Sequence, residues 1–335
     1  SACGGGGGSS PIVSPQDSPI SPPSVPPPAE PPIQLPIAAV DWQRDILATA
    51  LEVNVDTQQA TARIQLAASE SEAASFEIGD LAILAVESAA KGKQLALNYA
   101  VAGSALHIGM PASPASPVDV EIRYRYQSHN NFDGAAEPGF TFTWPYFCGN
   151  LFPCKSDPGE GLSFELSLQG VAQGQRAVFP ASVPGDSPAY ALAWAIGDYN
   201  YLDLGTTAAG TRVGAWYLPG EETSMRQGSI HLRAFFEWME TSFGPYTIGD
   251  EVASVSVPWG PGAFGGLEHH PFWHLSASSI SDTAIHLHEA AHGWFGNGVR
   301  MACWEDFVLS EGLATYLAAR GLGEIAGAGA GQALW

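Results

Sequence analysis

The feature that most constrains this sequence is the pentapeptide His-Glu-Ala-Ala-His at residues 288–292. In an α-helix, residues four apart project from the same face, one turn apart. Two imidazoles in that arrangement can bind a single Zn²⁺ ion. The pentapeptide therefore predicts a helix at this point of the chain, with a metal site on one face.

A third ligand is available further along the chain. Glu311 falls in the next predicted helix, and its carboxylate would complete a set of two histidines and one glutamate, leaving a fourth position for water. Glu289 would lie beside that position, where it could take a proton from zinc-bound water and deliver it to a leaving amine. The residues thus predict one Zn²⁺ ion held by His288, His292 and Glu311, with Glu289 as the catalytic base.

The residues around the predicted ligands follow a longer pattern. His-Glu-Ala-Ala-His-Gly-Trp-Phe-Gly-Asn at 288–297 is followed by Trp304 and by Glu-Gly-Leu-Ala-Thr-Tyr at 311–316. This run resembles the membrane-alanyl aminopeptidase family of zinc gluzincins, almost position for position. The resemblance implies a thermolysin-like zincin catalytic domain and an aminopeptidase that acts on peptides with a free N-terminus.

A second motif lies just upstream, where residues 265–269 read Gly-Gly-Leu-Glu-His. It resembles the family's Gly-x-Met-Glu-Asn motif, whose glutamate receives the substrate α-amine, and this role falls on Glu268. Gly265 and Gly266 would let the substrate backbone approach closely and pair with the strand. His269 stands in place of the family's Asn and would alter amine binding, since an imidazole can titrate near neutrality.

Alternatives remain open on the same scaffold. The chain could be an endopeptidase, an epoxide hydrolase or a non-catalytic, peptidase-like binding protein. His269, His270 and His274 could also form a second metal site, although histidines in loops are more often not ligands.

The rest of the chain predicts an α+β protein in three parts. Residues 1–36 are a Gly/Pro/Ser-rich tether, 37–222 an antiparallel β-sandwich or saddle domain, and 223–335 the first part of the catalytic domain. Residues 51–55 and 61–66 read as a hairpin, and 118–126 and 162–168 alternate apolar and polar residues as strands do. Residues 252–257 alternate like an edge strand.

Three helices are expected in the third part. One is amphipathic and spans residues 230–239. Another, capped by Ser281 or Asp282, would carry the pentapeptide and run to about Phe295. The last would run from about Trp304 to Arg320.

The two ends of the sequence suggest a piece of a longer envelope protein. Ser1-Ala2-Cys3 before five glycines resembles the end of a bacterial lipoprotein signal, which predicts a lipid on Cys3 and an extracytoplasmic, lipid-anchored location. A plain disordered tail is the alternative. The family's oxyanion-stabilising tyrosine should lie beyond Trp335, so the chain is expected to bind zinc but to have little peptidase activity.

Charge and cysteines add two further expectations. The formal net charge of −21 repels nucleic acid and anionic membranes, so neither is expected as a direct partner. Cys148 and Cys154 could form a disulfide in an oxidising compartment or remain buried thiols.

Overall fold

The structure is a computed structural model that describes residues 36–335, except 91–92, 130–132, 138, 145 and 260–263. These described residues form one compact unit. Cys3 and all but the last residue of the predicted tether lie outside the described residues, so the lipid anchor and the envelope location stay predictions. Among the described helices, none has the length and apolar character needed to cross a membrane.

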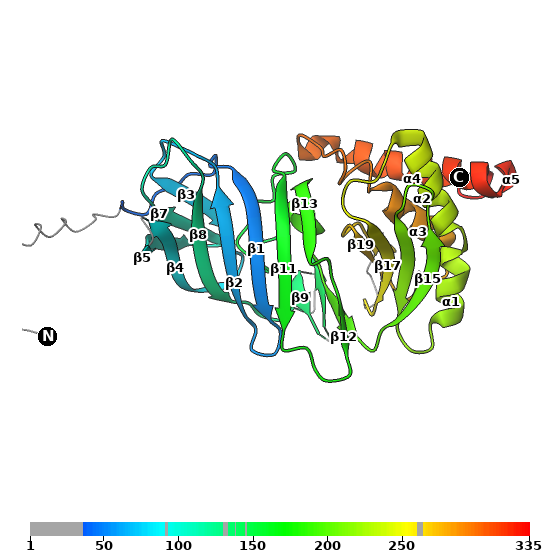
Figure 1. Cartoon of the computed structure of the whole chain (residues 1–335), viewed down its shortest axis with the longest axis horizontal. Helices are drawn as coiled ribbons and strands as arrows, with labels where there is room; N and C mark the ends of the chain where they lie inside the picture. Colours follow the sequence, from blue (N-terminus) through cyan, green and yellow to red (C-terminus); the bar gives the residue numbers. More distant parts are fainter. Residues whose placement is uncertain (1–35, 91–92, 130–132, 138, 145, 260–263) are drawn as a thin grey trace, which may run out of the picture. The chain divides into compact units, whose positions relative to one another are not determined.

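The first part of this unit is built from strands (blue to green in Figure 1). Its largest sheet has seven strands in the order β13-β11-β1-β2-β8-β4-β5. Their bounds are β1 Ile46–Asn54, β2 Gln59–Leu66, β4 Ala82–Ala90, β5 Lys93–Ala96, β8 Val118–Arg125, β11 Leu162–Gln169 and β13 Ser182–Ser187. The predicted hairpin is confirmed by the antiparallel pairing of β1 with β2. On its other side β1 pairs in parallel with β11, so the sheet is not purely antiparallel.

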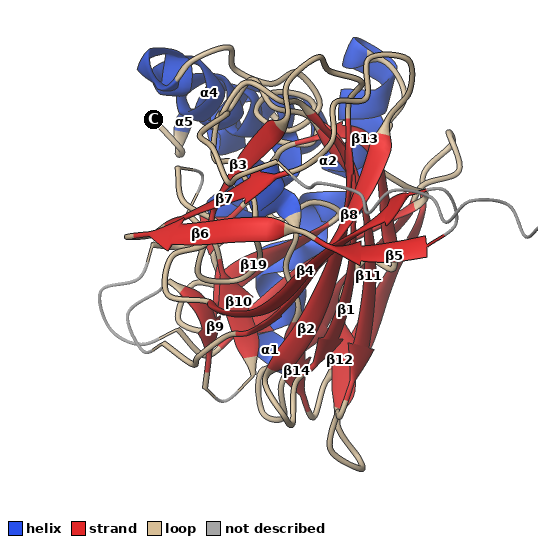
Figure 2. Cartoon of the chain, turned by 90° about the vertical axis from the view of Figure 1, so that its left-hand side faces the viewer, coloured by secondary structure: helices blue, strands red, loops and turns tan. Residues whose placement is uncertain are grey.

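Two smaller sheets complete the strand-rich part. Figure 2 shows β3 (Ala73–Glu77), β7 (Ala105–Gly109) and β6 (Asn98–Ala102) side by side as one of them. The other has the order β12-β14-β10-β9, with bounds Arg176–Val178, Ala195–Gly197, Phe140–Phe142 and Gly134–Ala136. Between β13 and β14 the chain makes a 3-10 turn, η1 (Ala189–Ala191).

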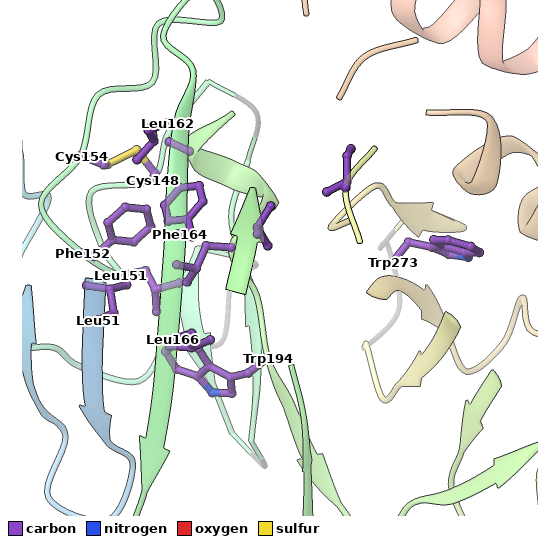
Figure 3. Close-up of a cluster of buried hydrophobic side chains, with 14 of the residues drawn as sticks. Leu51, Cys148, Leu151, Phe152, Cys154, Leu162, Phe164, Leu166, Trp194 and Trp273 are labelled. Carbon is purple, nitrogen blue, oxygen red and sulfur yellow. A yellow bond between two sulfur atoms is a disulfide. The ribbon is translucent and has the colours of Figure 1, made fainter. Parts of the chain in front are cut away.

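The core of this part is apolar and contains a disulfide. Figure 3 shows the Cys148–Cys154 bond beside the rings of Phe152 and Phe164, which meet edge to face with centroids 6.0 Å apart. Of the two alternatives left open for these cysteines, the structure contains the disulfide. The backbone of Cys154 also pairs with that of Glu77, which fixes the loop to β3.

A five-stranded sheet and its helices form the second part. The sheet order is β15-β16-β17-β19-β18, with bounds Asn200–Thr206, Arg212–Tyr217, Glu251–Val257, Phe272–Ser276 and Gly266–Leu267. The helices are α1 (Glu222–Gly228), η2 (Ser229–His231), α2 (Leu232–Phe243), α3 (Thr283–Ala291), η3 (Trp304–Asp306), α4 (Phe307–Ala326) and α5 (Ala328–Gln332). Because β15 and β16 precede residue 222 yet belong to this sheet, the domain boundary predicted there stays a prediction.

The edge-strand prediction for residues 252–257 is wrong. β17 pairs in parallel with β16 on one side and β19 on the other, so it is a central strand. The alternation misled because Ser254 is fully buried: its hydroxyl donates to His286 Nδ1 and accepts from Trp273 Nε1, both at 2.8 Å. A small polar residue with both bonds made is tolerated inside a sheet.

The predicted helices are present, with shifted ends. α2 buries Leu232, Phe235, Phe236 and Met239 on one face. Asp282 caps α3 by accepting a hydrogen bond from Ala284 N, but α3 ends at Ala291 rather than near residue 295. α4 extends past residue 320 to Ala326.

Candidate metal centre

The two histidines of the pentapeptide and Glu311 meet at one point. The Nε2 atoms of His288 and His292 are 3.1 Å apart, and Glu311 places one oxygen 3.2 Å from the first and the other 3.5 Å from the second. α3 supplies His288, the residue that caps its C-terminal end is His292, and the neighbouring α4 supplies the carboxylate.

Hydrogen bonds to the far ring nitrogens orient both imidazoles. His292 Nδ1 donates to the carbonyl of Phe295 at 3.0 Å, and His288 Nδ1 lies 3.3 Å from Thr315 Oγ1. A proton on Nδ1 leaves the Nε2 lone pair free to bind a metal. The two Nε2 atoms, 3.1 Å apart, then share a proton or a metal cation between them.

The donor set fits zinc. A tetrahedral Zn²⁺ ion with bonds of about 2.0–2.1 Å separates its ligand atoms by roughly 3.4 Å, close to the three separations in the structure. Burial alone would lower the pKa of His288, but Glu311 and the neighbouring Glu289 and Glu268 raise it to about 9. The site therefore favours positive charge where the predicted ligands converge.

Two further carboxylates face the same centre. Ligand atoms of Glu268, Glu289 and His292 all lie within 4.8 Å of one another. Glu289 is buried, and burial, together with the charges of Glu268 and Glu311, raises its pKa well above the ordinary value despite the opposing charge of His288. This second cluster is no independent metal site, because it shares His292, which has one free nitrogen.

The motif at 265–269 borders the metal centre from strand β18. Gly265, Gly266 and Glu268 line a cavity of about 800 Å³, together with His288, Glu289 and Glu311. Aromatic side chains from separate segments form its outer wall, where Trp144 stacks on Tyr146 and meets Phe264 edge to face. The cavity is open to solvent and holds every residue of the predicted site except His269 and His292.

Gly266 has a steric role that the sequence did not reveal. A Cβ at this position would lie 2.4 Å from Glu289 Oε1 and 2.7 Å from its Cγ. Contacts under 3.0 Å force the neighbour to move, so the absence of a side chain here leaves room for the predicted base. Gly265 does the same for Ile285, with 2.4 Å to its Cδ1.

Gly266→Ala is therefore expected to displace the Glu289 carboxylate and lower kcat by up to about 100-fold, with zinc affinity retained. Hydrolysis of leucyl-4-nitroanilide and zinc titration would measure the two effects. Gly312→Ala is the matched control, because a Cβ there meets nothing within 4 Å. Equal losses in both variants would contradict the steric role.

The structure turns His269 away from the cavity. Its ring is buried, and Nδ1 donates to the carbonyl of Tyr190 at 2.7 Å. His270 uses both ring nitrogens, with Nε2 donating to Glu289 O and Nδ1 accepting from Tyr246. The three histidines of the predicted second metal site do not form a ligand group in the part of the chain that the structure describes.

The neutral histidines behind the site predict sensitivity to acid. Burial lowers the pKa of His269 to about 4 and that of His274 well below its ordinary value. Between pH 6.5 and 4 the unfolded chain therefore binds more protons than the folded one, so stability falls as the pH falls through this range. For His269 the loss between pH 7.5 and 5 is about 2 kcal/mol.

Urea unfolding of metal-free protein at pH 7.5 and 5 would measure this loss. The variant His269→Asn is expected to lose less stability over the same interval. An equal loss in the parent and the variant would contradict the assignment.

The comparisons with known proteins agree with this geometry. A model of the peptidase family M1 domain matches residues 275–334, which contain all three predicted ligands. The segment that holds the predicted ligands is therefore similar to the peptidase family M1 domain. The predicted resemblance to gluzincin aminopeptidases is thereby confirmed.

Individual relatives extend the likeness beyond the M1 segment. The chain is 29% identical over 210 residues to human aminopeptidase RNPEPL1, an alignment that covers 55% of this chain and 27% of the human protein. It is 34% identical over 186 residues to mouse aminopeptidase B, covering 50% of this chain and 27% of that protein. The aligned part is thus about a quarter of the length of either relative.

The fold is similar to that of a solved M1 enzyme. The crystal structure of a mutant M1 zinc metallopeptidase from Deinococcus radiodurans superposes with a TM-score of 0.69 at 18% identity, covering 87% of this chain and 73% of that one. This likeness confirms the α+β prediction of a strand-rich domain followed by part of a zincin catalytic domain.

Two buried residues beside the metal centre are not predicted by the sequence alone. Tyr190 and Asn297 are buried beside Glu268, and the hydroxyl of Tyr190 lies 3.0 Å from Asn297 Oδ1. Asn297 is part of the motif that carries the family resemblance, but the sequence alone assigns it no function. Tyr190 comes from the strand-rich part, and no local pattern connects it to the metal centre.

Proposed function

We propose that this protein is a zinc aminopeptidase that removes single residues from peptides with a free N-terminus. The observation that carries the proposal is Glu268 Oε1, a buried carboxylate oxygen with no hydrogen-bond partner among the described residues. A buried carboxylate oxygen that lacks a hydrogen bond is costly unless a cation joins it. A substrate ammonium is such a cation.

The position of Glu268 suits that role. It lines the cavity together with the predicted base and two of the three ligands, with its carboxylate within 4.8 Å of ligand atoms of Glu289 and His292. An ammonium held there would place the first peptide carbonyl of the substrate near the metal centre. Selection of the terminal residue follows from that spacing.

Zinc, when bound by His288, His292 and Glu311, would supply Lewis acidity that lowers the pKa of water and polarises the carbonyl. Glu289 accepts a proton from the attacking water and returns it to the leaving amine. Its raised pKa favours holding the proton between the two steps. One ion accounts for all the ligand atoms of the set.

The names of the relatives support the same activity. Human RNPEPL1 and mouse aminopeptidase B are both called aminopeptidases. Two further solved neighbours are M1 metallopeptidases bound to L-arginine and to L-tryptophan, amino acids that carry the free amine required here.

A pair of ligands that differ only at the amine tests the proposal. The zinc-loaded protein is expected to bind leucinamide at least about tenfold more tightly than N-acetyl-leucinamide, since acetylation removes the ammonium. Glu268→Gln should abolish most of this preference. Calorimetric titration gives the affinities without requiring turnover, and leucyl- and acetyl-leucyl-4-nitroanilide give the corresponding hydrolysis rates.

Other outcomes point to the alternatives. Equal binding and cleavage of free and acetylated ligands would favour an endopeptidase. Hydrolysis of an epoxide substrate without peptide cleavage would favour an epoxide hydrolase, and binding of peptides without zinc would favour a peptidase-like binding protein.

A further inference from the structure

Tyr190 belongs to the strand-rich part of the chain, but its hydroxyl contacts a residue beside the metal centre. It lies in η1 and is 3% exposed. Its hydroxyl is 3.0 Å from Asn297 Oδ1, and Asn297 follows α3, the helix that carries His288 and is capped by His292. The contact therefore joins two parts of the chain that are distant in sequence.

Asn297 passes this contact on to Glu268. Its Nδ2 donates to the backbone carbonyl of Glu268 at 2.6 Å, and its backbone N–H donates to the carbonyl of His292 at 3.0 Å. Because a carbonyl can only accept, Nδ2 must face Glu268, and Oδ1 is left to face Tyr190. The Tyr190 hydroxyl is then the donor, and the side-chain amide has one orientation.

A second contact from Tyr190 reaches the next residue of the motif. The backbone carbonyl of Tyr190 accepts a hydrogen bond from His269 Nδ1 at 2.7 Å. One residue of the strand-rich part therefore holds Glu268 through Asn297 and holds His269 directly. All four of these residues are buried, so water does not compete for the bonds.

The chemistry of the tyrosine keeps this arrangement in one state. Burial, the charge of Glu268 and a side-chain hydrogen bond to Glu268 raise the pKa of Tyr190 well above its ordinary value, so its hydroxyl keeps its proton. Because the hydroxyl stays protonated, Tyr190 keeps donating to Asn297 Oδ1, and Asn297 Nδ2 keeps donating to the backbone carbonyl of Glu268.

We propose that Tyr190 is a positioning residue that, through Asn297, sets the place of Glu268 for recognition of the substrate amine. Amine recognition then depends on the strand-rich part of the chain as well as on the M1 segment. The inference rests on the proposed function, in which Glu268 binds the ammonium. It goes further by assigning control of that contact to a residue outside the catalytic motifs.

Tyr190→Phe tests the proposal, because it removes one hydroxyl and keeps the ring and the backbone carbonyl. The preference of the zinc-loaded variant for leucinamide over N-acetyl-leucinamide is expected to fall about tenfold, as for a lost buried hydrogen bond. Zinc affinity should stay at the parent value. Tyr124→Phe is the matched control: Tyr124 is also buried, its hydroxyl donates to Leu151 O at 3.0 Å, and it lies in β8 of the large sheet.

A double-mutant cycle separates positioning from general loosening. Asn297→Ser should lower the preference as Tyr190→Phe does, and the two changes together should cost less than the sum of the single losses, because the two residues share the connection through Asn297. Fully additive losses would overturn the proposal. So would an unchanged preference in Tyr190→Phe, or an equal weakening of both ligands.

The result also distinguishes this inference from the function on which it rests. A parent protein with no preference for the free amine refutes the proposed function, and the positioning role with it. A parent that discriminates, beside a Tyr190→Phe variant that discriminates equally well, refutes only the positioning role.

Discussion

Alanine in place of His292 is expected to weaken zinc binding by more than about 100-fold. Loss of groups that only orient a ligand already costs 10–100-fold in metal affinity, so loss of a ligand should cost more. His292 is fully buried, and its Nδ1 donates to Phe295 O, so Nε2 is the nitrogen that faces the metal centre. Alanine has no atom that could replace this ligand. Competition with a chromogenic chelator at neutral pH would measure the affinity.

His286→Ala provides the control on the same helix. His286 is as deeply buried as His292, but its ring bonds to Ser254 and to the carbonyl of Ile280. This variant should lose folding stability and keep its zinc affinity. Equal loss of zinc affinity in both variants would show that an intact α3, rather than His292 itself, holds the metal.

Glutamine in place of Glu289 is expected to lower kcat by about 10²–10⁴-fold, the usual contribution of a general base. Glutamine has the same shape but cannot accept the proton of the attacking water. Since Glu289 belongs to none of the three ligand positions, zinc affinity should not fall. Hydrolysis of leucyl-4-nitroanilide by zinc-loaded variant and parent measures the change in kcat.

Glu324→Gln serves as the matched substitution, because Glu324 is an exposed carboxylate on α4. It should leave kcat unchanged. Full activity in Glu289→Gln would contradict the role of base, whereas a joint loss of zinc and activity would place Glu289 among the groups that hold the metal.

The metal centre was predictable because its information is local. Four-residue spacing on a helix decides that His288 and His292 share a face, and Asp282 begins that helix through a contact two residues away. The hairpin of β1 and β2 is readable for the same reason. The contacts that define the histidine pair, the helix cap and the hairpin all join residues that are close in sequence.

The features that escaped prediction depend on distant partners. Ser254 looks like a half-exposed strand position until His286 and Trp273 supply its hydrogen bonds. Gly321 reads as the end of α4, yet a Cβ there would lie 2.5 Å from the ring of Phe235, so the glycine serves helix packing and the helix continues. Such contacts join residues that are distant in sequence, so the local hydrophobic pattern does not predict them.

The place of β1 in the large sheet has a consequence for how the chain is made. β1 can pair with β2 almost as soon as both have left the ribosome, but its other edge is completed by β11, which is translated much later. Until then the growing chain carries an open, largely apolar strand edge, the kind of surface that promotes aggregation. Recombinant production should therefore benefit from slow synthesis at low temperature and from chaperones that shield nascent strands.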